Sequence, residues 1–149
     1  MKTRNWILRA ALIVALLGCS ANTLFGQGCK ELACDNQNQI DPKAIELRQV
    51  HGTAVDPNGT VIPQLCVGIF TEPAHKLVRY SQSDKDGVFI VDTNGLPDGE
   101  YRLVGRVTGF CPANAILRIK SHSRRKNSLV LHMNGRGIDS CSYVGLEKK

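Results

Sequence analysis

Aromatic residues are scarce in this chain of 149 residues, and its single tryptophan, Trp6, lies close to the N-terminus. Proteins that bind sugars usually stack them on exposed aromatic rings, because a ring offers a large apolar face. The rings expected in a core are Phe89, Tyr101 and Phe110, and those left for the surface are Phe70, Tyr80 and Tyr143. Carbohydrate binding is therefore a minor option.

Recognisable catalytic patterns are also missing. No Gly-x-Ser-x-Gly turn presents a serine nucleophile, and the four histidines (His51, His75, His122 and His132) lack the spacing of paired metal ligands. Asp84 and Asp86 could offer oxygen ligands to Ca²⁺, but the further acidic positions of a calcium loop are absent. The sequence therefore predicts no catalytic residues, no metal site and no cofactor.

The excess of positive charge is small once the N-terminal segment is set aside. The formal net charge is +6, from 19 lysines and arginines against 13 acids. Three of these basic residues and none of the acids lie in residues 1–26, which leaves 16 against 13, a charge of +3. Nucleic-acid-binding proteins need a basic face that neutralises several phosphates. We therefore expect no nucleic acid partner.

The N-terminal segment has the form of a secretion signal. Basic residues precede an apolar run over residues 10–18, which is far too short to span a bilayer. Leu16-Leu17-Gly18-Cys19 resembles a bacterial lipobox, in which a lipoprotein signal over residues 1–18 is removed and Cys19 carries lipid. Ordinary cleavage after Gly26 is slightly favoured. Either route predicts a protein outside the cytoplasm, membrane-anchored in the first case and secreted or periplasmic in the second.

The remaining cysteines indicate disulfide bonds, because the compartment outside the inner membrane is oxidising. Besides Cys19 there are five, namely Cys29, Cys34, Cys66, Cys111 and Cys141. An odd number cannot pair fully within one molecule, so we expect two disulfides. Cys29 and Cys34 lie in a polar irregular arm over residues 27–45, where they could close a small loop. A bridge from one of them to the rest of the protein is the alternative.

The rest of the chain alternates apolar stretches with tight-turn sequences. Asp56-Pro57-Asn58-Gly59 and Asp84-Lys85-Asp86-Gly87 favour turns, since Asp and Asn side chains bond nearby backbone and Gly allows positive φ. Alternating apolar residues predict a half-buried strand from Glu100 to Thr108. Further strands are expected near residues 50–54, 65–70, 78–83, 88–91, 115–119 and 128–133. Seven strands without a helical period predict an all-β sandwich.

The order of these turns and strands resembles the carboxypeptidase regulatory-like domain. The resemblance rests on Gly52-Thr-Ala-Val-Asp56-Pro57-Asn58-Gly59, Ile62-Pro63, Asp84-Lys-Asp86-Gly87-Val-Phe89, Leu96-Pro97-Asp98-Gly99-Glu-Tyr101 and Gly109-Phe110. It implies a single seven-strand antiparallel β-sandwich of transthyretin-like or immunoglobulin-like fold over residues 46–134, followed by a tail over residues 135–149. It also implies an extracytoplasmic module that accompanies peptidases, surface proteins and outer-membrane receptors without catalysing a reaction.

The chain departs from the family pattern in its cysteines and after Ile62-Pro63, where Gln64-Leu65 replaces a glycine and a small residue. The family rarely needs cysteines, so Cys66, Cys111 and Cys141 look like additions. Cys111 follows the longest expected strand and Cys141 lies in the tail. A bridge between these two would pin the tail to the domain.

Basic residues gather between the last two expected strands, at Lys120, His122, Arg124, Arg125 and Lys126. Such a cluster could meet anionic lipid headgroups or an acidic cell-wall polymer. The alternative is a solvated loop that keeps the protein soluble. Of the candidate binding surfaces in the sequence, this cluster carries the most concentrated charge.

These features predict a secreted or lipid-anchored bacterial β-sandwich with a binding or structural role in the cell envelope, whose partner is an envelope protein or polymer. Two alternatives stay open. A small hydrolase of transthyretin-like fold would show a cleft where a His, an Arg and a hydroxyl converge, although the C-terminal Tyr-Arg-Gly-Ser pattern of such enzymes is missing. A secreted inhibitor would present a loop such as Thr71 to Lys76 to a partner enzyme.

Overall fold

The computed structural model describes residues 28–34, 43–124, 126–137 and 141–147. The expected signal segment, with Cys19, and the basic residue Arg125 lie outside these ranges. The described residues contain nine strands and no helix, so they include no helix that could cross a membrane. The prediction of an all-β fold is confirmed.

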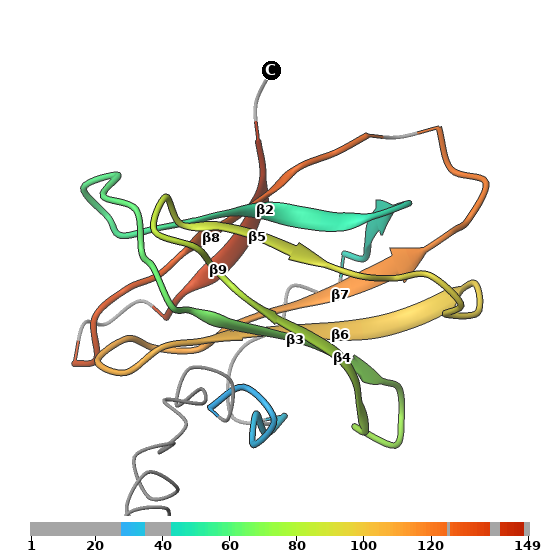
Figure 1. The fold of residues 1–149 in the computed structure, drawn as a ribbon, viewed down its shortest axis with the longest axis horizontal. Coiled ribbons are helices and arrows are strands. Elements are labelled where there is room, and N and C mark those ends of the chain that lie inside the picture. Colours follow the sequence, from blue (N-terminus) through green and yellow to red (C-terminus); the bar gives the residue numbers. More distant parts are fainter. Residues whose placement is uncertain (1–27, 35–42, 125, 138–140, 148–149) are drawn as a thin grey trace, which may run out of the picture.

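Seven of the nine strands lie where the sequence predicts them, and two short strands, the first and the last, were not expected. The strands are β1 (Ile45–Leu47), β2 (Val50–Val55), β3 (Cys66–Thr71), β4 (Leu77–Gln82), β5 (Val88–Val91), β6 (Gly99–Arg106), β7 (Ala113–Ile119), β8 (Leu129–His132) and β9 (Tyr143–Leu146). They form one sheet in the order β4-β3-β6-β7-β9-β8-β2-β5, and β1 pairs with β7. This sheet curls into a mostly closed, barrel-like shape, with β2 and β5 across the core from β3 and β6 (Figure 1).

The expectation of a seven-strand antiparallel sandwich needs correction, because the sheet has nine strands and is mixed. Three pairings are parallel: β1 with β7, β2 with β8, and β7 with β9. Alternation of apolar residues along a strand reports which face is buried, but it is the same for parallel and antiparallel partners. The alternation of apolar residues therefore could not predict whether neighbouring strands pair in parallel or antiparallel.

One core fills the space between the two sides of the sheet. Alternate residues of β2, β6 and β8 point into it, including Val50, Leu103 and Leu131, which are fully buried. Tyr101 is buried as predicted, and its hydroxyl donates a 2.8 Å hydrogen bond to the carbonyl of Pro97. A tyrosine that bonds backbone a few residues upstream in this way is a recurrent corner of β-sandwiches.

The two predicted turns are confirmed. The Asp84 carboxylate accepts 2.9 Å hydrogen bonds from the backbone N–H groups of Asp86 and Val88, and Gly87 has a positive φ of 73°. Asp56 bonds the backbone of the first turn in the same way. These carboxylates hold turns together, which agrees with the interpretation that Asp84 is a turn residue rather than a calcium ligand.

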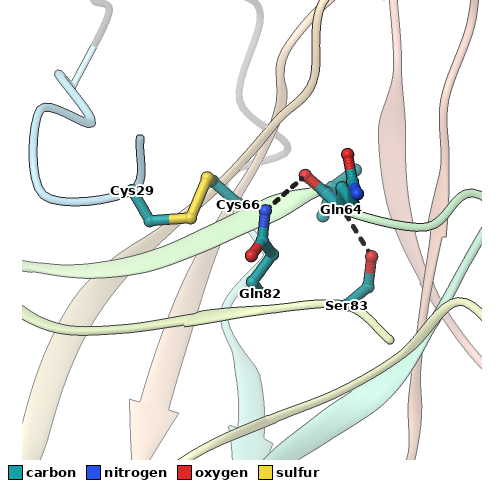
Figure 2. The surroundings of a disulfide bond; sticks show 6 residues. Cys29, Gln64, Cys66, Gln82 and Ser83 are labelled. Atoms are coloured by element: carbon teal, nitrogen blue, oxygen red, sulfur yellow. Dashed lines mark hydrogen bonds between the residues drawn. A yellow bond between two sulfur atoms is a disulfide. The ribbon is translucent and has the colours of Figure 1, made fainter. Parts of the chain in front are cut away.

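The described start of the N-terminal arm, residues 28–34, lies against the outer face of β3 and β6, where it appears in blue below the sheet (Figure 1). A disulfide joins Cys29 to Cys66 at the start of β3 (Figure 2). Leu32 packs over Gly68, whose missing side chain makes room, since a Cβ there would lie 2.5 Å from a Leu32 methyl carbon. Of the two alternatives for the arm, the bridge to the body is therefore the one formed. Phe70, expected at the surface, is 2% exposed beneath this arm.

Among the described glycines, Gly52 leaves the least room for a side chain, at the point where β2 pairs with β8. A Cβ at Gly52 would lie 2.1 Å from the carbonyl oxygen of Leu129, which is backbone and cannot rotate away. We expect Gly52→Ala to lower the free energy of unfolding by about 3 kcal/mol or more. Denaturant unfolding followed by circular dichroism measures this loss.

Gly99→Ala is the matched control for this substitution. Gly99 also lies in a strand, but the nearest atom to its added Cβ would be a Tyr101 ring carbon at 3.8 Å, an ordinary contact. We expect a change below about 0.5 kcal/mol. Equal stabilities of the two variants would contradict the account of how β2 meets β8.

Candidate anion-binding site

The basic segment between β7 and β8 is anchored to β1 through one carboxylate. Glu46 in β1 accepts a 3.0 Å contact from the Lys120 ammonium and a 3.2 Å hydrogen bond from the Ser123 hydroxyl. The backbone N–H of Lys120 also donates to the carbonyl of Leu47 at 3.0 Å. The segment therefore folds back over the turn that follows β1.

A second carboxylate holds the start of the same segment. The Asp98 side chain accepts a 2.9 Å hydrogen bond from the backbone N–H of Ser121. Hydrogen bonds from Ser121, with smaller contributions from the charges of His122 and Lys120, lower the pKa of the Asp98 carboxyl below its ordinary value. This contact therefore stabilises the fold at pH values above the ordinary pKa of a carboxyl. The stabilisation is lost as the pH falls through the lowered pKa of Asp98.

These anchors leave a cleft of about 640 Å³ beside the segment. Its lining residues are Arg48, Gln49, His51, His122, Ser123, Arg124, Lys126 and Asn127. Arginine and lysine supply three permanent positive charges, two histidine side chains lie beside them, and no aspartate or glutamate among the described residues lines the cleft. A concave surface lined by charge of one sign concentrates the field and attracts counter-ions. We call these eight residues the basic cleft.

The basic cleft contains part of the cluster that the sequence singled out. His122, Arg124 and Lys126 line it, whereas Lys120 does not and has its ammonium at Glu46 instead. Arg125 lies outside the described residues. The cluster thus divides into a residue that anchors the loop and three that face the cleft.

Arg48 and His51 are the lining residues that sequence reasoning missed. They reach the cleft because two parallel pairings flank it, with Leu47 opposite Ile119 and Gly52 opposite Leu129. The connection from β1 to β2 and the connection from β7 to β8 therefore run side by side. No local sequence signal could have predicted that these two connections are neighbours, since each segment alone has the composition of an ordinary polar connection.

A second cleft of about 630 Å³ adjoins the first and shares Gln49 and His51 with it. It runs over the outer face of β2 and β5, where Val88 and Ile90 are 38% and 69% exposed. Among the described residues that line it, Asp92 is the one acid. A ligand held in the basic cleft would thus have an apolar surface beside it.

The basic cleft meets one compositional test for a hydrolase, since a His, an Arg and a hydroxyl converge there. Catalysis also requires a base within hydrogen-bonding reach of the nucleophile, although such contacts can tighten only when substrate binds. Ser123 directs its hydroxyl to Glu46. In the described part of the chain, neither His51 nor His122 takes part in a hydrogen bond that would position it as a base. The Ser83 hydroxyl lies outside this cleft, where it is buried and donates to the carbonyl of Ile62.

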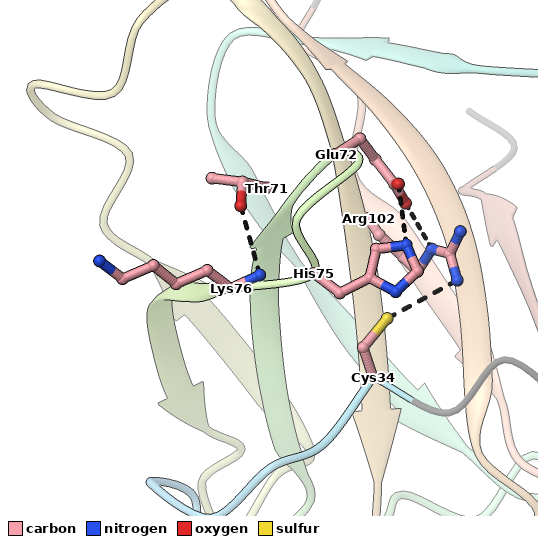
Figure 3. Close-up of polar contacts among 6 residues, drawn as sticks. All are labelled: Cys34, Thr71, Glu72, His75, Lys76 and Arg102. Carbon is pink, nitrogen blue, oxygen red and sulfur yellow. Dashed lines mark hydrogen bonds and ion pairs between the residues drawn. The ribbon is translucent and has the colours of Figure 1, made fainter.

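A polar network lies on the far side of the sheet, around the turn that an inhibitor would present. His75 and Arg102 both contact the Glu72 carboxylate, at 3.1 Å and 2.6 Å, and an Arg102 nitrogen lies 3.6 Å from the sulfur of Cys34 (Figure 3). Glu72 and His75 therefore turn back onto the sheet. The adjoining cleft carries Glu72 and Glu100 beside Arg102 and Arg118, so its charges largely compensate one another.

The remaining candidates are dispersed. His132 stacks on the exposed ring of Tyr143 with centroids 4.6 Å apart. Within the described ranges, no three His, Cys, Asp or Glu side chains gather as metal ligands would. The sulfurs of Cys111 and Cys141 lie 3.5 Å apart.

Comparison with known proteins returned no matching family model and no matching curated protein. The family resemblance therefore stands on the motif residues alone.

The two ion pairs on the outer face of β6 differ in exposure, which predicts different contributions to stability. Arg102 and Glu72 have side chains 12% and 23% exposed, whereas Arg118 and Glu100 are 47% and 51% exposed. We expect Glu72→Gln to destabilise by about 1–3 kcal/mol, because it leaves a partly buried guanidinium without its carboxylate. Glu100→Gln, the control, should cost less than about 1 kcal/mol. Urea unfolding measures both, and a larger loss for Glu100→Gln would contradict this ranking.

Proposed function

We propose that this protein is a non-catalytic binding module of the bacterial cell envelope that holds an anionic group in the basic cleft. The observation that carries the proposal is the convergence of Arg48, Arg124, Lys126 and two histidines around one concavity that no acid of the described residues lines. The anionic group is a phosphate or carboxylate, borne by an acidic envelope polymer or by a lipid headgroup.

Electrostatics favours a ligand here over a merely solvated loop. Side chains of like charge that share a concavity repel one another, and the repulsion is relieved when an anion enters. Carboxylates that could have neutralised the cleft are used elsewhere: Glu46 holds Lys120 and Ser123, and Asp98 holds Ser121. The cations of the cleft are thus left available to a partner.

The size and chemistry of the basic cleft fit a small anionic group on a larger molecule. Ligand sites typically enclose about 300–1,000 Å³, and this cleft has about 640 Å³. Two guanidinium groups, from Arg48 and Arg124, offer paired donors that match the oxygens of a phosphate or carboxylate. Gln49 and Asn127 add neutral donors and acceptors.

The family and the location are part of the same proposal. Seven strands in the expected order, the two glycine-containing turns at Asp56 and Asp84 and the Tyr101 corner support a module of the carboxypeptidase regulatory-like family. The signal-like N-terminus and the disulfide between Cys29 and Cys66 support a place outside the cytoplasm, either secreted or lipid-anchored at Cys19. Family members of this kind bind or support other envelope components.

A small hydrolase is the second candidate, because His122, Arg124 and Ser123 line the same cleft. In that case one histidine would take the proton of the serine or of a water, and an arginine would stabilise the developing negative charge. The requirement is a hydrogen-bonded pair of base and nucleophile. Substrate binding would have to create that pair.

Binding to three anionic probes tests the proposal: phosphatidylglycerol vesicles, a soluble polyphosphate and inorganic phosphate. We expect Arg48→Gln combined with Arg124→Gln to weaken binding of the preferred probe about tenfold or more, since charged hydrogen bonds are worth about 1.5–3 kcal/mol. Vesicle binding alone would assign a lipid headgroup, and polyphosphate binding an acidic polymer. Binding should weaken with added salt.

The matched control combines Lys76→Gln with Lys85→Gln. Both lysines are exposed and lie outside the basic cleft, so this variant has the same net charge as the arginine variant. We expect the affinity of this control variant to stay within about twofold of that of the parent protein. A tenfold change, by comparison, corresponds to about 1.4 kcal/mol. Equal losses in the two variants would reject a specific site, and so would failure of all three probes to bind.

A chromogenic ester assay separates the two candidate functions. The binding module should show no turnover above the uncatalysed rate. Turnover that disappears in His122→Ala would instead establish the hydrolase.

A further inference from the structure

We propose that Cys111 and Cys141 form a second disulfide, which locks β9 into the sheet and can be opened by reductants. The two sulfurs lie 3.5 Å apart, at the starts of β7 and β9. A disulfide requires about 2.05 Å. The remaining difference is small enough for rotation of the two side chains to close it.

The backbone around both cysteines is already fixed in place. The Ser142 hydroxyl donates to the carbonyl of Cys111 at 2.6 Å and accepts a 2.8 Å hydrogen bond from the N–H of Asn134. Asn134 in turn accepts from the N–H of Cys111 at 2.8 Å and donates its side-chain amide to the carbonyl of Cys141 at 3.2 Å. Ser142 and Asn134 thus hold the two cysteine backbones beside one another.

Closure of the pair requires an oxidant. The hydrogen bond with Cys111 and the proximity of its sulfur raise the pKa of the Cys141 thiol, because two negative sulfurs so close together repel. The raised pKa lowers the fraction of the reactive thiolate, so closure depends on the geometry and on the oxidant supplied. Oxidation removes two protons and two electrons from the thiols and forms the S–S bond. A low-molecular-weight disulfide of the extracytoplasmic compartment, or oxidised glutathione in a test tube, takes up the electrons and is reduced to two thiols.

This bond would reinforce the weakest junction in the sheet. β9 pairs with β8 over four residues, but with β7 only through Asn114 and Tyr143. The Cys111–Cys141 bridge spans that junction from one side and would keep the sheet closed between β7 and β9. Without the bridge, β9 depends mainly on its hydrogen bonds to β8.

The two disulfides should differ in their response to reductants. Cys29, in the arm, is only 5% exposed, whereas Cys141 is exposed. Exposed disulfides are attacked more readily by thiols, because the attacking thiolate must reach a sulfur. Mild reduction should therefore open Cys111–Cys141 before Cys29–Cys66. The fifth cysteine, Cys34, belongs to neither bridge.

Peptide mapping of the full, unreduced chain after treatment with oxidised glutathione tests the pairing directly. We expect a cross-linked peptide pair that contains Cys111 and Cys141, and protection of both from iodoacetamide. Alkylation of both residues in the treated protein would overturn the proposal. A bridge from Cys34 to either of them would overturn it as well.

Thermal unfolding tests what the bridge does. The oxidised protein should melt about 10 °C or more above the variant Cys111→Ser with Cys141→Ser, because the bridge closes a loop of roughly 30 residues. After mild reduction, the two proteins should melt at the same temperature and hydrogen exchange in β9 should quicken. If the oxidised protein carries the bridge but melts at the same temperature as the double variant, the stabilising role of the bridge is overturned. The mapping experiment stands even if the variant fails to fold.

Discussion

The parallel pairing of β2 with β8 is the constraint on which the rest of the structure depends. It draws the two backbones together at Gly52, where the carbonyl of Leu129 leaves no room for a side chain. This pairing joins β5 and β2 to the C-terminal strands and so closes the sheet around one core. It also fixes where the connection between β7 and β8 returns to the sheet, because that connection ends at Leu129. A change at Gly52 would thus disturb both the fold and the basic cleft.

The charges of the molecule are arranged so that its two faces differ. On the outer face of β6 and β7, Arg102 meets Glu72 and Arg118 meets Glu100, so the charges of the groove between these pairs largely compensate one another. Near the basic cleft, Glu46 and Asp98 bind residues of the loop between β7 and β8. No acid among the described lining residues is left to compensate the cations of the cleft. An anionic partner would find only one of these surfaces attractive. The difference arises from where the acids lie rather than from the number of basic residues.

Covalent bonds supplement a small core in this protein. The arm contributes Leu32 to a cluster with Phe70 and Val104, and the Cys29–Cys66 disulfide holds that short segment in place. A few apolar contacts could not order such a polar segment unaided, because fixing each residue costs about 1–2 kcal/mol of conformational entropy. The proposed bridge at Cys111 would act similarly on β9. Both ends of the described chain would then be fastened to the same sheet.

The sequence by itself determined the strands from Val50 to His132, the turns at Asp56 and Asp84, and the basic segment, because these depend on alternation, local hydrogen bonds and composition. It also placed Phe89 and Tyr101 in the core. Only the tertiary structure decided the parallel pairings, the strands β1 and β9, the partner of Cys29 and the presence of Arg48 beside the basic segment. Each of these depends on which surfaces meet across tens of residues, and a short-range pattern is the same whichever partner is chosen.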